Sequence, residues 1–527
     1  MQVSSPCKLL TLACVAIVTV HAADWAAEHS LACAAYDSGD YTSAEQHDRA
    51  ALAKAESFGE NDLRLEATLT HLGAVLQARG TCCDAEPLMR RALAIREVQF
   101  GKNSIQTALG QNNLAAVWQQ AGRTEEARKL EAEALATAER VLESNNPELI
   151  PYLTLAALTE RDANQYGRAE ELLKRALVLA EKDTAQNPRR LMQVWRYLGS
   201  VYSSESRFDA AEQTYKSLLS LSESRFGSQG LDTAYALANL GGVLCGRKFY
   251  VEARTYLIRA VDIFQHIHEL GTAFFAATLQ NLATAELYLG QLHSAEQHTL
   301  LAVKVLEDQP GASREAMAVA ENNLGQVYAA EGRFKEAERA TMQAKDIWIA
   351  IAGPESSRVA TAISNLGALY VEEHKYKKGE SFYNESAEID SKILGTASVG
   401  YARDLNRLGV LYNYEKHFSQ SEEVLRKALE IDSKKLGTNS PILAEPYLNL
   451  ATSLQGQKRR EEALECYRRG IEIMENAGQK HAPNMAVVLE QYSSLLREMR
   501  QWADAEKAST EALGIRVKGK VSGETYR

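Results

Sequence analysis

Cysteine and histidine are the side chains in this sequence that could act as nucleophiles, redox centres or metal ligands. Cys82 and Cys83 are adjacent in a predicted turn, where they could form a redox pair or a bridge to Cys33. The cysteine spacing matches no zinc-site pattern. His266 and His268 are two residues apart, which places them on different sides of a helix. We therefore predict no metal site and no cofactor.

The short motifs of common catalytic sites are also missing from the sequence. There is no glycine-rich phosphate loop, no Gly-x-Ser-x-Gly elbow and no His-Glu-x-x-His. Paired carboxylates such as Glu125-Glu126 stand at predicted helix starts, where they favour the positive end of the helix dipole. We therefore predict a non-enzymatic protein without catalytic residues, and keep a redox role for the adjacent cysteines as an alternative.

Amide side chains recur at a constant step along the chain. Asn-Leu-Gly or Asn-Leu-Ala appears six times, and the leucine positions form a ladder that runs from Leu72 to Leu450 with a step of 42 residues. Two ladders of small residues, starting at Ala85 and Ala92, keep the same step. An earlier repeat is centred on Leu31, which precedes Leu72 by one residue less than the constant step. Such periodicity is the signature of a tandem array.

Each repeat predicts two helices. The Asn-Leu segment lies on the first helix, A, which ends in a polar or glycine-bearing turn such as Glu331-Gly332-Arg333. The second helix, B, ends near a Leu-Gly or Phe-Gly pair such as Phe226-Gly227, because glycine is favoured past the last helical turn. Glycine or alanine after the ladder leucine lets the two backbones approach. One hairpin cannot bury its apolar face, but a stack can.

This pattern resembles the tetratricopeptide repeat. The usual repeat has about 34 residues, and the longer step here resembles the extended repeats of kinesin light chains, as in Asn323-Leu-Gly-Gln-Val-Tyr328 and the following Gly332-Arg-Phe-Lys-Glu-Ala-Glu338. The resemblance implies an all-α fold, a right-handed superhelical solenoid of about twelve helix-turn-helix repeats. The coiled coil and motor-binding segment of kinesin light chains are absent, so kinesin transport is not implied.

The resemblance also implies a binding surface. In the family, the helix A residue just before the ladder leucine faces the concave side of the superhelix. An amide there can hold the main chain of an extended peptide, whatever its sequence. Alternatively, the amides bond neighbouring helices and only order the stack. The candidate peptide-binding residues are Asn113, Asn239, Asn281, Asn322, Asn323, Asn365, Asn406 and Asn449, with Arg403 and Arg407, which could hold an acidic group or form a solvated pair.

Composition and charge limit the class of partner. The formal net charge of −10 argues against nucleic acid, because phosphate binding needs a basic surface. We therefore predict a scaffold that binds other proteins or extended peptides in its concave groove. The alternative is a self-assembling structural array of the envelope, which would use its end repeats or its convex face.

The N-terminal segment predicts export. Lys8 is the one charged residue before Asp24, an apolar stretch runs from Leu9 to Val20, and Ala22 suits the position before a cleavage site. We assign residues 1–22 to a signal peptide, 23–515 to the repeat array and 516–527 to a short polar tail, and expect a periplasmic or secreted protein. The apolar stretch is short for a membrane span, although an uncleaved anchor is the alternative.

We predict that the mature chain begins at Ala23. The physical reason is that an apolar stretch followed by small residues is cut by signal peptidase. N-terminal sequencing of the exported protein checks this, and a sequence that begins at Met1 would show that the segment is retained.

Overall fold

The computed structural model describes residues 22–36, 40–79, 81–268, 270–308, 314–478, 480 and 483–521. These residues are almost entirely helical and include no β-strand, which confirms the predicted all-α class. Within these ranges, none of the helices combines the length and the apolar character that a membrane crossing requires. Apart from Ala22, the predicted signal peptide lies outside the described residues, so its cleavage remains a prediction.

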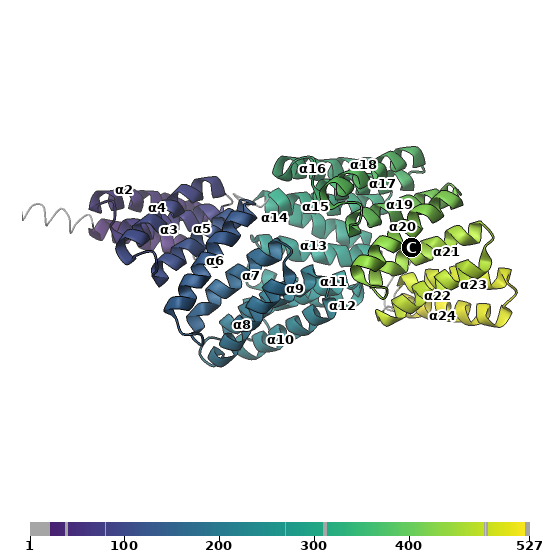
Figure 1. Ribbon diagram of the computed structural model, residues 1–527, viewed down its shortest axis with the longest axis horizontal. Helices are drawn as coiled ribbons and strands as arrows, with labels where there is room; N and C mark the ends of the chain where they lie inside the picture. The colour runs from purple at the N-terminus through teal and green to yellow at the C-terminus, as the bar shows by residue number, and fades with distance from the viewer. Residues whose placement is uncertain are drawn as a thin grey trace, which may run out of the picture. The chain divides into compact units, whose positions relative to one another are not determined.

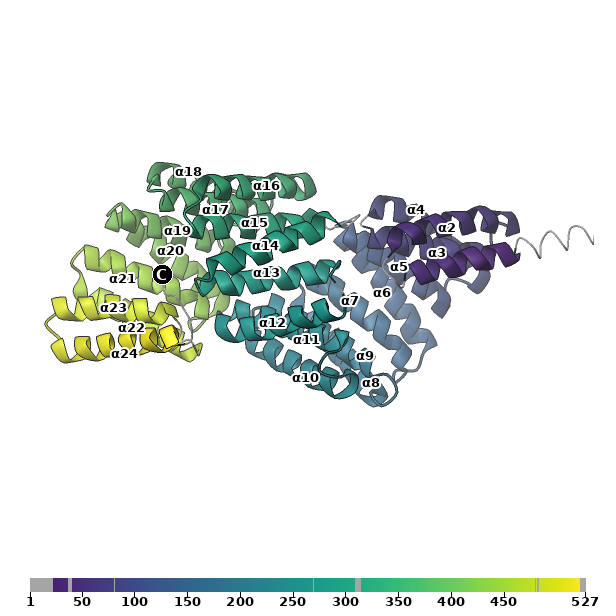
Figure 2. The same ribbon diagram turned by 180° about the vertical axis from the view of Figure 1, so that it is seen from behind.

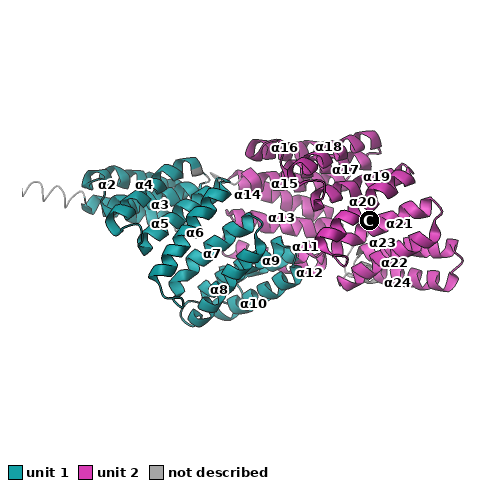
Figure 3. Ribbon diagram, in the orientation of Figure 1, with its two compact units in different colours: residues 1–243, 310–312 teal, residues 244–309, 313–527 magenta. Residues whose placement is uncertain are grey.

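The helices divide into two compact units, which Figure 3 colours separately. Unit 1 contains the described residues up to Val243, and unit 2 those from Leu244 onward. Unit 1 comprises helical residues 22–36, α2 (Tyr41–Ala55), α3 (Leu63–Ala78), α4 (Cys82–Phe100), α5 (Ile105–Gln120), α6 (Thr124–Val141), α7 (Ile150–Asp162), α8 (Tyr166–Asp183), α9 (Pro188–Ser204), α10 (Phe208–Phe226) and most of α11 (Leu231–Gly246). Unit 2 comprises α12 (Tyr250–His266), α13 (Ala273–Tyr288), α14 (Leu292–Glu307), α15 (Arg314–Ala330), α16 (Phe334–Ala352), α17 (Ser357–Glu372), α18 (Tyr376–Leu394), α19 (Val399–Tyr414), α20 (Phe418–Leu436), α21 (Ala444–Gly456), α22 (Arg460–Asn476), α23 (Pro483–Glu498) and α24 (Trp502–Val521). Short 3-10 turns occupy Glu56–Phe58, Pro147–Leu149 and Pro441–Leu443.

Helices A and B alternate along each unit as the sequence predicts (Figures 1 and 2). From α3 onward the odd-numbered helices are A helices and the even-numbered ones are B helices. Several B helices end at glycine, as at Gly227 and Gly395, whose φ angles are 84° and 80°, whereas others, such as α6 and α14, do not. Helix α24 continues to Val521, so helical structure extends into the segment expected as a polar tail. The chain is a solenoid of repeated helix-turn-helix pairs.

One left-handed residue ends the A helix in repeat after repeat. The Arg333 N–H donates to Tyr328 O at 2.8 Å and the Gly332 N–H to Ala329 O at 2.9 Å, the pair of bonds that a Schellman turn makes. Equivalent residues, with φ between 59° and 77°, are Gly122, Asn164, Ser206, Lys248, Gly290, Gly332, His374, Lys416, Lys458 and Arg500. They follow the 42-residue step, and most of them are not glycine.

The glycine after the ladder leucine is where helices A and B touch. A Cβ added at Gly325 of α15 would overlap Thr341 Oγ1 of α16. A Cβ added at Gly367 of α17 would lie 2.7 Å from Tyr383 Cδ1 of α18. Both separations are shorter than packed carbon atoms allow. This confirms the prediction that a small residue is needed there for the backbones to approach.

Successive A helices of unit 2 lie close to one another. Each of α13, α15, α17 and α19 contacts the next A helix as well as its own B helix, whereas no two B helices make comparable contact in the described part of the chain. In a curved stack, the elements on the inside of the bend are the more closely spaced ones. The A helices therefore form the inner row of unit 2, and the B helices form its outer row.

Some B helices carry a buried carboxyl where other repeats are apolar. Glu131 of α6 occupies the repeat position at which Leu173 and Leu257 lie in other repeats. It is 1% exposed, and neither of its carboxyl oxygens is hydrogen-bonded to a described residue. Burial raises the pKa of Glu131 to about 8. Asp432 of α20 is also buried, and burial raises its pKa to about 6. Both carboxyls therefore hold their protons to higher pH than an exposed carboxyl does.

We predict that the left-handed turn position limits stability. Lys416→Gly should raise the free energy of unfolding by about 0.5–1 kcal/mol, because glycine adopts positive φ without a Cβ clash. Gly332→Ala, at the equivalent turn of another repeat, should lower it by about 1 kcal/mol. Urea unfolding followed by circular dichroism checks both variants, and shifts of the same sign would contradict the explanation.

Candidate functional site

Four of the predicted amides form hydrogen bonds between neighbouring repeats. Asn365 Nδ2 of α17 donates to Asn322 Oδ1 of α15 at 2.8 Å, and Asn449 Nδ2 of α21 donates to Asn406 Oδ1 of α19 at 3.0 Å. Asn406 also donates to Glu445 Oε1 at 3.1 Å. Asn322 and Asn406 are buried, so these bonds satisfy amides that would otherwise lose their hydration unpaired. At these positions the amides order the stack, which is the alternative that the sequence left open.

The arginine pair lies in the same register and has partners within the chain. Arg407 donates to Ser364 Oγ of the preceding A helix, and Ser364 donates to Asp404 Oδ1 at 3.0 Å. Burial lowers the pKa of the Arg407 guanidinium. Arg403 is exposed and lies 3.4 Å from Asp390 Oδ2. Arg407 is therefore bonded within the chain, whereas Arg403 is exposed and ion-paired, and both help to join helices of unit 2.

The remaining predicted amides make no side-chain hydrogen bond to a described residue. Asn281 on α13 and Asn323 on α15 are half-buried on adjacent A helices of unit 2. Asn113 on α5 and Asn239 on α11 are half-buried in unit 1, and Asn239 Nδ2 is shielded from solvent. Asn113, Asn281 and Asn323 therefore keep their hydrogen-bonding capacity for a ligand, and of these Asn281 and Asn323 lie on adjacent A helices.

An exposed tyrosine lies at the end of an A helix of unit 2. Tyr288 ends α13, is 56% exposed, and stacks on Tyr250 with ring centroids 4.6 Å apart. Burial nonetheless raises the pKa of its hydroxyl, on which the charges of Arg407 and Glu445 also act. Tyr288 thus combines an exposed ring with a hydroxyl that feels charges from α19 and α21. We call the surface of the A-helix row of unit 2 on which it lies the inner face.

A second exposed tyrosine stands in the same register. Tyr414 ends α19, is 62% exposed, and stacks on Tyr376 with ring centroids 6.4 Å apart. Tyr288 and Tyr414 each follow a ladder leucine by six residues. The repeat register places both tyrosines on one face of the A helices, seven residues after the position just before the leucine.

Two described cysteines have strongly protonated thiols. Cys33 and Cys83 are thiols, so the bridge considered between these two is not formed, and the side chain of Cys82 lies outside the described residues. Burial raises the pKa of Cys245 to about 12 and that of Cys466 to about 11. Such thiols are protonated at neutral pH and react slowly. No described cysteine supports the redox alternative.

The family follows from the repeats themselves. The tetratricopeptide repeat model matches residues 64–140, 106–182, 190–266, 232–308, 274–350, 315–380, 358–434 and 442–516. The chain belongs to the tetratricopeptide repeat family. The resemblance seen in the Asn-Leu-Gly ladder is thereby confirmed over most of this tetratricopeptide repeat protein.

Solved structures match the chain at low sequence identity. A Rap protein complexed with competence and sporulation factor is 16% identical, with a TM-score of 0.50, and the match covers 71% of this chain and 99% of that one. BtubC (BKLC) from P. vanneervenii is 21% identical, with a TM-score of 0.34, over 45% of this chain and 91% of that one. Kinesin light chain TPR-like repeats from P. anserina are 19% identical, with a TM-score of 0.34, over 39% and 96%. No curated protein sequence matches the chain.

We predict that the inter-repeat amide pairs stabilise the stack. Asn365→Ala should lower the free energy of unfolding by about 1–3 kcal/mol, because it leaves the buried Asn322 amide without its partner. Asn323→Ala, the same change in the same register, should alter it by less than about 0.5 kcal/mol. Urea unfolding of both variants is the measurement, and equal losses would show that the pair adds nothing.

Proposed function

We propose that this tetratricopeptide repeat protein is a non-enzymatic scaffold outside the cytoplasm, and that the inner face of unit 2 holds an extended peptide or loop of a partner protein. The observation that supports this best is Tyr288, an aromatic side chain of the A-helix row that is 56% exposed and whose hydroxyl is acted on by the charges of Arg407 and Glu445. The half-buried amides Asn281 and Asn323 lie on the same A-helix row. Aromatic, amide and charged groups together suit a peptide rather than a small apolar ligand.

The spacing of the A helices fits an extended main chain. Packed helices lie about 8–10 Å apart, and an extended peptide rises about 3.3 Å per residue. Asn281 and Asn323, one repeat apart, would therefore meet peptide groups about three residues apart. Each amide can donate to a carbonyl and accept from an N–H. Binding of this kind does not depend on the side chains of the peptide. Because the amides are neutral, the affinity should also depend only weakly on salt.

The proposed location rests on the N-terminal sequence. The apolar stretch from Leu9 to Val20, with Lys8 before it and Ala22 after it, is typical of a secretory signal. Fractionation of the native cells, with the chain detected in the envelope or the medium, tests this part independently of the binding site.

The C-terminal repeat favours self-assembly as a second candidate function. Trp502, Leu513 and Val517 of α24 are 64%, 61% and 51% exposed. This exposed apolar face of α24 could pack against another copy of the chain.

Site-specific photo-crosslinking separates the two candidates. A photoreactive phenylalanine analogue replaces Tyr288 on the inner face, and in a matched chain it replaces Leu300, an exposed residue of the outer helix α14. We expect a discrete adduct with another protein from position 288 only. Adducts that contain two copies of this chain would support self-assembly instead, and equal labelling from both positions would contradict an inner-face site.

We predict that the amides of α13 and α15 contribute to binding of the crosslinked partner. Replacing Asn281 and Asn323 together by Ala should weaken binding about fivefold to a hundredfold, because each lost neutral hydrogen bond costs about 0.5–1.5 kcal/mol. Titration calorimetry with the partner peptide, at two salt concentrations, is the measurement.

The matched control replaces Gln297 and Gln343, exposed amides of the outer helices α14 and α16, by Ala. Circular dichroism confirms that each variant is folded. If the inner-face variant binds as tightly as the control, the amides are not the site.

A further inference from the structure

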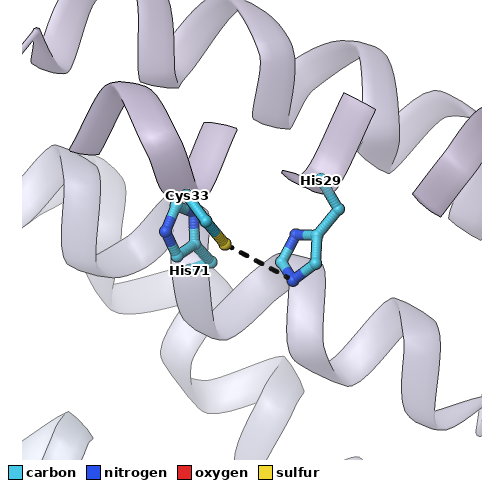
Figure 4. Close-up of side chains that lie close together, drawn as sticks. All are labelled: His29, Cys33 and His71. Carbon is cyan, nitrogen blue, oxygen red and sulfur yellow. Dashed lines mark hydrogen bonds between the residues drawn. The ribbon is translucent and has the colours of Figure 1, made fainter. Parts of the chain in front are cut away.

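Two histidines and a cysteine from different helices meet at the N-terminal end of unit 1. His29 and Cys33 are four residues apart on the helix of residues 22–36, so they lie on one helix face. His71 comes from α3. One ligand atom from each of the three side chains lies within 4.8 Å of the other two, and Figure 4 shows Cys33 Sγ directed toward His29 Nε2, at 4.0 Å. All three side chains are half-buried, so solvent can reach the cluster.

A buried carboxylate stands behind both imidazoles. Asp48 of α2 is 0% exposed, and its Oδ2 lies 2.6 Å from His71 Nδ1. Its Oδ1 lies 3.8 Å from His29 Nδ1. A carboxylate bonded to one ring nitrogen fixes the ring and leaves the other nitrogen as a metal ligand, the arrangement common to histidine metal sites.

The second of these contacts is incomplete. Asp48 Oδ1 and His29 Nδ1 are both shielded from solvent, and neither has a hydrogen-bond partner among the described residues. A buried unpaired carboxylate oxygen is costly. A movement of His29 that closed the 3.8 Å gap would satisfy both atoms. Drawing the three side chains toward a common centre is one way to produce such a movement.

The repeat register explains why these two histidines meet. His71 precedes the ladder residue Leu72, as Asn365 precedes Leu366. His29 stands two residues before Leu31, as Asn322 stands two before Leu324. The histidine pair therefore takes the place that the bonded amide pair takes between α15 and α17. The two imidazoles, with their ring centroids 5.4 Å apart, do not bond each other as the amides do, but both can bind one metal ion.

We propose that His29, Cys33 and His71 bind one zinc ion, with Asp48 as the carboxylate that orients the imidazoles. Imidazole nitrogen and thiolate sulfur are the ligands that zinc prefers, and three protein ligands leave a fourth position open to water. Tetrahedral zinc with bonds of about 2.0–2.3 Å places its ligand atoms about 3.3–3.6 Å apart. The cluster needs only a small contraction to reach that geometry. On binding, Cys33 loses its proton to solvent and the ion loses water.

Bound zinc would fasten the first helix of the array. Residues 22–36 form the first described helix, and among the described residues they pack against later helices on one side only, a situation in which a repeat frays easily. The three ligands join this helix to α3, and Asp48 adds α2. The ion would therefore act as an end clip for unit 1, and it requires no catalytic role.

Cobalt substitution tests the site directly. The full chain, stripped of metal with a chelator, is titrated with Co²⁺ and then with Zn²⁺. We expect one Co²⁺ per chain, with a thiolate-to-cobalt charge-transfer band, which Zn²⁺ then abolishes because it binds more tightly. Cys33→Ser should remove the band, whereas Cys83→Ser should retain it. A cobalt complex without the band, or a band that survives in Cys33→Ser, would overturn the proposal.

The orienting role of Asp48 has its own test. Asp48→Asn should weaken Zn²⁺ binding about 10–100-fold, whereas His47→Ala, a change at the neighbouring histidine that bonds Glu28 instead, should leave it unchanged. Circular dichroism of the metal-free variants controls for folding. Hydrogen exchange of residues 22–36 should slow with Zn²⁺ in the unmodified chain and not in Cys33→Ser. Equal exchange with and without Zn²⁺ in the unmodified chain would overturn the end-clip role.

Discussion

Each hairpin of this chain can bury its apolar face only against the next hairpin, and everything else in the structure depends on the register of that contact. The ladder leucines Leu240, Leu366 and Leu450 are at most 2% exposed. One residue added inside an A helix would turn its later side chains by about 100° and move the leucine off the interface. A constant step of 42 residues is therefore a packing requirement rather than a trace of sequence history alone.

The same register brings one polar pair to the inner side of several junctions, and the chemistry of the pair varies along the chain. Asn322 with Asn365 gives a hydrogen bond between two side-chain amides, and Ser364 with Arg407 gives a charge-assisted hydrogen bond. At the first junction the pair is His29 with His71. Because packing fixes the geometry of this position, its side chains can join neighbouring repeats at one junction and bind a ligand at another.

The sequence predicts the period, the helix pairs and the close approach at Gly325, because each depends on local chain chemistry that recurs. It does not predict which amides are bonded, since Asn323 and Asn365 share a register and differ only in what the preceding repeat presents. The spacing of residues along the sequence does not reveal the histidine cluster, because His71 lies on the A helix of the next repeat. The sequence also does not reveal the left-handed turn at Lys416, because the residue there is not glycine.

The buried carboxyl of Glu131 makes the folding of unit 1 a proton-uptake reaction. Its pKa of about 8 in the folded chain lies above the ordinary 4.5 that applies when the chain is unfolded. Between these values the folded chain holds a proton that the unfolded chain has lost, so the stability of this part of the array falls as pH rises through that range. Asp432 has the same effect in unit 2 over a narrower range, up to about 6. Mildly acidic pH would therefore increase the stability of both units without any change in their contacts.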